Sequence, residues 1–183
     1  MRRATVMGVA VAALATAYAS AKQGAPRSGP PARFGLGRAA TAEEIKVWDI
    51  DVMPDGDGLP PGSGTPAGGV KIYTRKCAAC HGPSGTEGPF DRLVGRDQGP
   101  ARTIGNYWPY ATTLYDYVHR AMPLGAPGSL APDEVYSLVA YLLWRNEIIP
   151  ETAVIDARTL PRVVMPARDR FVADDRRGGP EIR

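Results

Sequence analysis

The sequence predicts a mostly α-helical fold in which three to four short helices are joined by long loops. Three segments carry apolar residues at helical spacing, and no convincing run alternates between apolar and polar residues as a half-buried strand would. Glycine and proline are abundant, with 21 and 18 residues in a chain of 183, which favours long ordered loops. With only three Phe and three Trp residues, the core is expected to need a component that is not protein.

Each predicted helix is marked by local sequence signals. Helices are expected over residues 70–77, 114–121 and 135–142, with a single turn at 43–47. Thr113 and Asp116 are expected to form a capping pair at the start of the second helix. Pro132 suits the first position of the third helix, and the two acidic residues that follow it complement the helix dipole.

The first residues predict export from the cytoplasm. Arg2 and Arg3 precede a short apolar run, and small residues near Ala19 to Ala21 fit a cleavage site, so residues 1–21 are interpreted as a signal peptide. The run is short for the roughly 20 apolar residues of a membrane span, which favours cleavage over an uncleaved anchor. A periplasmic protein with no stable membrane span after cleavage is therefore expected.

The remaining chain divides into three predicted parts. Residues 22–67 form a loop-rich leader, residues 68–150 form the helical domain, and residues 151–183 form an extended basic tail. The formal net charge of +3 is small and gives no reason to expect nucleic acid as a partner.

The segment Cys77-Ala78-Ala79-Cys80-His81 fits the attachment site of one c-type haem. Two thiols about one helical turn apart can each add to one haem vinyl group, and the adjacent His81 imidazole can bind the iron. Haem c, covalently attached, is therefore the expected cofactor, and a domain without it is expected to be largely unfolded.

Two other readings of the cysteine pair are less favoured. A redox-active dithiol is expected in a βαβ setting, which the sequence lacks. A structural zinc site usually has four ligands, whereas the chain offers two cysteines and, besides His81, only His119.

Met122 is the preferred candidate for the second axial ligand of the iron. It follows the second predicted helix, and Pro123 and Gly125 place it on a loop that can cross a haem. A thioether ligand closes the iron site and raises its reduction potential. Met165 is the runner-up, and Met53 and His119 are weaker candidates for which packing or solvent exposure is the simpler reading.

Aromatic and basic residues near the middle of the chain are candidates for contacts with the haem. Tyr107 and Trp108 could donate a hydrogen bond to a propionate or form a wall of the site, although plain core packing explains them equally well. Arg96 and Arg102 could pair with the propionates, although most arginines are solvated surface groups.

The haem motif, the helix before it and Met122-Pro123 resemble a class I cytochrome c over roughly residues 68–145. A narrower resemblance, to the SoxD family of cytochrome subunits in sulfur oxidation, spans nearly the whole chain after the signal peptide. It is carried by the segments Phe34 to Gly64, Ile104 to Pro123 and Tyr141 to Glu151. Some members have two haem domains, whereas this chain has one CxxCH motif.

The resemblance implies a function and partners. Cys77, Cys80, His81 and Met122 match the family's haem positions. The chain would be an electron-transfer subunit without a catalytic site, accepting single electrons from a SoxC-like molybdenum-cofactor subunit that oxidises sulfane sulfur or sulfite. A downstream cytochrome or oxidase would take the electrons. A free cytochrome shuttle, a haem enzyme or gas sensor with an open iron site, and a dithiol oxidoreductase are the alternatives.

Overall fold

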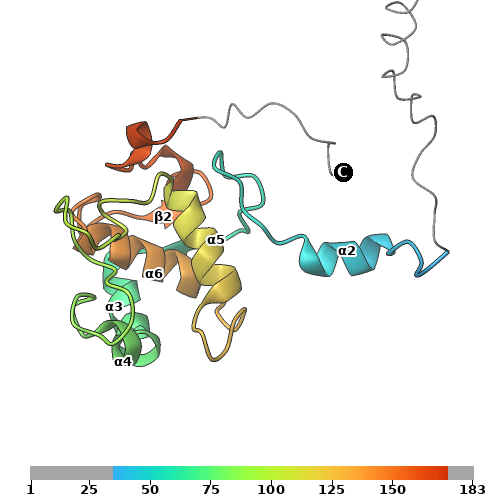
Figure 1. Ribbon diagram of the computed structural model, residues 1–183, viewed down its shortest axis with the longest axis horizontal. Coiled ribbons are helices and arrows are strands. Elements are labelled where there is room, and N and C mark those ends of the chain that lie inside the picture. The colour runs from blue at the N-terminus through green and yellow to red at the C-terminus, as the bar shows by residue number, and fades with distance from the viewer. Residues whose placement is uncertain (1–34, 173–183) are drawn as a thin grey trace, which may run out of the picture. The chain divides into compact units, whose positions relative to one another are not determined.

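The computed structural model describes residues 35–172 (Figure 1). Within them, the compact unit begins at Thr41. The predicted signal peptide, with its cleavage site, lies outside the described residues, as do residues 22–34 and 173–183. The elements are α2 (Ala42–Trp48), β1 (Ser63–Gly64), α3 (Pro66–Lys76), α4 (Ala78–His81), α5 (Ala111–Ala121), α6 (Pro132–Arg145), β2 (Ile155–Asp156) and the 3₁₀ turns η1 (Leu160–Arg162) and η2 (Arg168–Arg170). The prediction of a mostly helical fold is confirmed.

Helix α3 begins earlier than the sequence pattern indicates. The hydroxyl of Thr65 caps the helix by accepting a hydrogen bond from the Gly68 backbone N–H (3.1 Å), and Pro66 occupies the first turn. Gly68 and Gly69 therefore lie inside the helix. Gly69 faces the backbone of α6 closely, which apolar periodicity cannot reveal.

Gly69 allows α3 and α6 to cross with their backbones nearly touching. A Cβ atom built on Gly69 would lie 2.2 Å from the Ser137 carbonyl oxygen and 2.5 Å from the Tyr141 Cβ. One turn along α3, Tyr73 packs its ring against Tyr141, with the ring centroids 4.9 Å apart. This crossing fixes the end of α3, where Cys77 lies.

We expect Gly69→Ala to destabilise the folded protein by about 2 kcal/mol, because overpacking a tight contact typically costs about 1–3 kcal/mol. Gly68→Ala is the matched control in the same helix. Its added methyl would meet the movable Ser137 hydroxyl at 3.2 Å rather than backbone. Denaturant unfolding followed by circular dichroism measures both. Equal effects from the two substitutions would contradict the close crossing at Gly69.

The expected capping pair at the start of the second helix is wrong. Helix α5 begins at Ala111, and its N-cap residue makes no side-chain capping bond. Asp116 instead lies buried within the helix, where its Oδ1 accepts hydrogen bonds from the Val52 backbone N–H (3.0 Å) and from Arg120 Nε (2.8 Å). The carboxylate therefore fastens the leader to α5, a long-range role that local sequence patterns do not show.

Parts of the leader and the tail belong to the same core as the helices. The two-residue strands β1 and β2 pair antiparallel, with Ser63 opposite Asp156 and Gly64 opposite Ile155. The buried core also includes residues outside 68–150, namely Val52, Ile155, Leu160, Met165 and Ala167. The compact unit thus extends beyond the limits predicted for the helical domain. In the part of the chain that the structure describes, no helix has both the length and the apolar character to cross a membrane.

Candidate functional site

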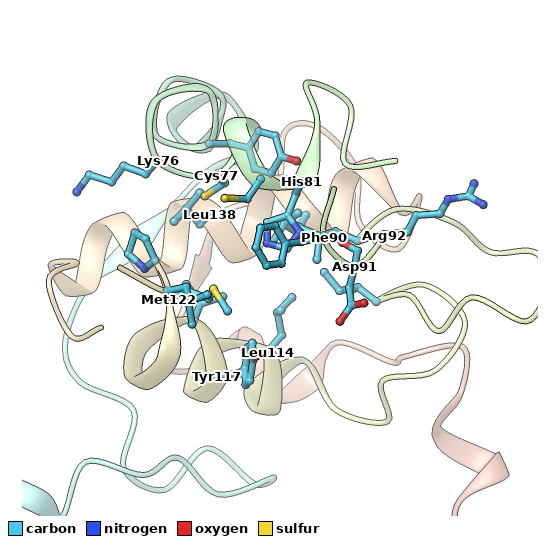
Figure 2. Close-up of a pocket in the computed structure, with 18 of the residues that line it drawn as sticks. Lys76, Cys77, His81, Phe90, Asp91, Arg92, Leu114, Tyr117, Met122 and Leu138 are labelled. Atoms are coloured by element: carbon cyan, nitrogen blue, oxygen red, sulfur yellow. Dashed lines mark hydrogen bonds between the residues drawn. The ribbon is translucent and has the colours of Figure 1, made fainter. Parts of the chain in front are cut away.

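A cavity of about 390 Å³ opens between the cysteine motif and helices α5 and α6. Figure 2 shows Cys77 and His81 on one side of this space and Met122, just past the end of α5, on another. Its walls are mainly apolar and include Ile104, Leu114, Val118, Leu130, Leu138 and Leu142. The size is within the range of roughly 300–1,000 Å³ that is usual for small-molecule sites.

The turn from α3 into α4 places both cysteines at the cavity. Cys77 ends α3 and also precedes α4, and its carbonyl accepts hydrogen bonds from the backbone N–H groups of Cys80 (3.1 Å) and His81 (3.0 Å). One tight helical turn therefore separates the two thiols, and both line the cavity. This is the spacing that attachment to two neighbouring vinyl groups requires.

The imidazole of His81 is oriented by a backbone carbonyl. Its Nδ1 lies 2.8 Å from the Asp91 carbonyl oxygen, which can only accept a hydrogen bond. Nδ1 must therefore carry the proton, and Nε2 is left with its lone pair for an iron ion. Holding the ring through its second nitrogen is the usual way in which proteins set the tautomer of a metal-binding histidine.

The donor set and the lining together fit a c-type haem. His81 supplies an imidazole nitrogen, and Met122 supplies a thioether from another wall of the same cavity. Aliphatic side chains of α5 and α6 would contact the flat apolar porphyrin face. Of the four candidates for the second axial ligand, which all lie in the described part of the chain, Met122 is the one that lines the cavity.

The rival ligands lie elsewhere. Met165 is 2% exposed and packs in the hydrophobic core, where its neighbour Val163 also rests against buried residues. Met53 is half exposed on the leader. His119 is not solvent-facing as expected: it is half-buried, with its ring centroid 5.9 Å from that of Tyr115.

The aromatic and arginine candidates divide into two groups. Trp108 and Arg102 line the cavity, and Trp108 packs edge-on against Tyr117, with the ring centroids 5.6 Å apart. Tyr107 and Arg96 are not among the lining residues. The guanidinium of Arg102 stacks over Tyr107, 4.5 Å from the ring centroid. Arg96 lies 3.6 Å from the Glu147 carboxylate.

The alternative readings of the cysteine pair find little support in the geometry. Burial, the main cause, raises the pKa of the Cys77 thiol to about 11, whereas a reactive dithiol needs a lowered pKa to form its thiolate. Across residues 35–172, no three His, Cys, Asp or Glu side chains come together as a metal site. A four-ligand zinc site therefore has no candidate there.

Asn146 does not line the cavity but holds a loop beside it, and sequence reasoning missed this residue. It is fully buried, and its carboxamide accepts from the Gly95 backbone N–H (2.9 Å) and donates to the carbonyls of Leu93 (3.2 Å) and Leu142 (2.8 Å). These bonds fasten the loop that follows Asp91 to the end of α6. The one available signal is a polar residue directly after a long apolar helix.

The loop after His81 is closed by Glu87. Its carboxylate accepts hydrogen bonds from the Ser84 backbone N–H (3.1 Å), the Ser84 hydroxyl and the Thr86 backbone N–H (3.3 Å). These bonds, with that of the Ser84 hydroxyl foremost, lower the pKa of Glu87 to about 2. The Glu87 carboxylate therefore has a lower pKa in the folded chain than in the unfolded chain.

This carboxylate predicts a pH dependence with a definite sign. Because the folded pKa lies below the ordinary value of 4.5, the stabilisation is complete above pH 4.5 and is lost as the pH falls toward 2. We expect Glu87→Gln to flatten the decline of the unfolding free energy in this window, and Ser84→Ala to flatten it in part. Denaturant titrations of the purified protein at several pH values measure the slope. A wild-type slope in Glu87→Gln would contradict this role.

Comparisons with known proteins bear on the same residues. A family model described as cytochrome c oxidase, cbb3-type, subunit III matches residues 64–142. A solved structure titled sulfane dehydrogenase SoxCD from Paracoccus pantotrophus is similar with a TM-score of 0.70 and 42% sequence identity, covering 78% of this chain and 73% of that chain. Among curated proteins, none matches the chain closely enough to count as a relative.

Proposed function

Because this chain belongs to the c-type cytochromes that resemble the SoxD subunit of SoxCD, we propose that it is a periplasmic monohaem electron-transfer subunit. It accepts single electrons from a molybdenum-containing subunit that oxidises sulfane sulfur or sulfite, and it passes them toward the respiratory chain. The observation that carries the proposal is a cavity bordered by Cys77, Cys80, His81 and Met122 in a chain 42% identical to one in SoxCD.

The residues around the cavity have distinct tasks toward one haem c. Cys77 and Cys80 would hold it by thioether bonds, while the His81 imidazole and the Met122 thioether would bind its iron. When bound, the haem supplies reversible one-electron chemistry at its iron. The Asp91 carbonyl keeps the His81 ring in position, and the aliphatic walls from α5 and α6 exclude water. No residue is assigned to bond making or breaking in a substrate.

Electrons would pass at the mouth of the cavity. Phe90, Tyr117 and Leu124 line the cavity and are also exposed at the surface. Exposed large apolar side chains beside a cofactor site form a contact area for a redox partner. The two electrons from an oxidation on the partner would pass through this mouth one at a time, in two successive steps.

The test is haem reduction by the partner. The purified cytochrome is mixed with the SoxC-like subunit, and the reduced haem spectrum is followed after addition of a sulfane or sulfite substrate. We expect the haem to be reduced only when the SoxC-like subunit and the substrate are both present. We also expect metal analysis of the co-purified complex to find molybdenum. Reduction at the same rate by unrelated donors would instead favour a free shuttle. Binding of carbon monoxide to the reduced wild-type protein would favour an open-site haem protein.

A further inference from the structure

Helix α2 and the residues after it present apolar side chains that nothing in the described chain covers. Helix α2 buries none of its seven residues, and Trp48 is 85% and Val47 69% exposed. Ile45, one turn before Trp48, and Ile50 are also exposed. We call residues 42–51 the arm. A short run with this many large exposed apolar residues is typical of an interaction site.

The helix in the arm is specified by its own local signals. The Thr41 hydroxyl accepts from the Glu44 backbone N–H (3.2 Å), and the Thr41 backbone N–H donates to the Glu44 carboxylate (2.9 Å), which completes a capping box. A helix of seven residues is nevertheless marginal in water, because most helix stability comes from packing of an apolar face. The sequence thus specifies a helix that has no packing partner within the described residues.

The end of the arm is fastened to the haem domain. The next residue, Val52, is buried, and its backbone N–H donates to Asp116 on α5 (3.0 Å). Helix α5 ends at Ala121, directly before Met122. The arm therefore ends at the helix that leads to Met122.

The charges of the arm and the similarity of the chain to SoxCD indicate which kind of molecule binds the arm. Around its apolar residues stand Glu43, Asp49 and Asp51 as well as the capping Glu44, against one basic residue, Lys46. The similarity to the chain in SoxCD covers 78% of this sequence, which is a larger share than residues 64–142 make up. The similarity therefore extends beyond the residues that the cytochrome family model matches. We propose that the arm docks in an apolar pocket bordered by Lys and Arg side chains on the molybdenum-cofactor subunit. This deepens the proposed function and rests on it.

Substitutions of exposed residues test this docking without disturbing the haem site. The full haem-loaded chain is compared with Trp48→Ser and with Ile45→Ser, and Val164→Ser in the tail, where Val164 is 76% exposed, serves as the matched control. Binding to the immobilised molybdenum subunit gives Kd, and haem reduction at saturating subunit gives the electron-transfer rate. We expect Trp48→Ser to raise Kd roughly 30-fold, as loss of a buried aromatic anchor does, with an unchanged saturated rate.

Charge variants add an independent measurement. Asp51→Lys should slow association at low salt, and high salt should weaken wild-type binding, because the acidic rim steers the encounter. Unchanged Kd in both arm variants, with wild-type binding intact, would overturn the docking and leave the proposed function standing. Failure of the wild type to bind the subunit would overturn both. A wild-type homodimer that Trp48→Ser dissociates would assign the arm to a second copy and would also overturn the proposal.

Discussion

Replacing Cys77 and Cys80 with alanine is expected to give a colourless chain that is largely unfolded. Without the two thioether bonds, haem would be held only by axial ligands and apolar contacts, and it would be lost during purification. The cavity, with a volume of about 390 Å³, would then lack the haem that is expected to fill it. The apolar side chains that line it would then contact water or empty space, and both are unfavourable.

The whole net stability of a domain is only about 5–15 kcal/mol, so even part of this cost can unfold it. The cavity is open on one side, so water would relieve part of the cost, yet the helices around it would still lose their main shared contact. Packing between α3 and α6 at Gly69 and Tyr73 does not involve the cysteines, so residual helix content is expected there.

The measurements are haem absorbance, intact mass and far-ultraviolet circular dichroism. Ala79→Ser is the matched control, since Ala79 is an exposed residue between the same two cysteines and its replacement keeps the CxxCH spacing. This control should keep the Soret band and the added mass of one haem. A native-like circular dichroism spectrum in the haem-free double variant would show that the protein core suffices, and the structural role assigned to haem would then be wrong.

The sequence and the structure agree most where local signals decide. Pro132 does occupy the first turn of α6. The cysteine motif could be found because haem attachment requires one fixed spacing of two thiols and a histidine, and all three lie within five consecutive residues.

Long-range contacts explain what could not be predicted. Asp116 carries the same local pattern as a capping residue, but its bond to Val52 spans 64 positions and overrides that pattern. Asn146 reaches Gly95 across 51 positions to hold a loop beside the cavity. The backbone of α6 approaches Gly69 so closely that a Cβ atom would not fit, and no periodicity within α3 encodes that approach. Such pairings depend on the completed fold.

Met122→Ala is expected to change the spectrum and the reduction potential of the haem strongly while leaving the haem attached. Loss of the thioether should abolish the long-wavelength Met-to-iron absorption band of the oxidised protein. It should also lower the reduction potential by a sizeable part of the roughly 0.8 V over which axial ligands tune haem proteins. The opened position should let the reduced protein bind carbon monoxide, which the wild type should resist.

Met165→Leu is the matched control for this substitution, because Met165 is the rival ligand and is buried in the core rather than lining the cavity. A volume-conserving change of this kind usually costs under about 1.5 kcal/mol, so the fold should persist with band and potential unchanged. Spectroscopy and a redox titration of the two variants separate the candidates. If the band survived in Met122→Ala and vanished in Met165→Leu, the second ligand would come from the tail. The cavity would then have to rearrange around haem, because α5 presents Met122 to it while Met165 packs among core side chains.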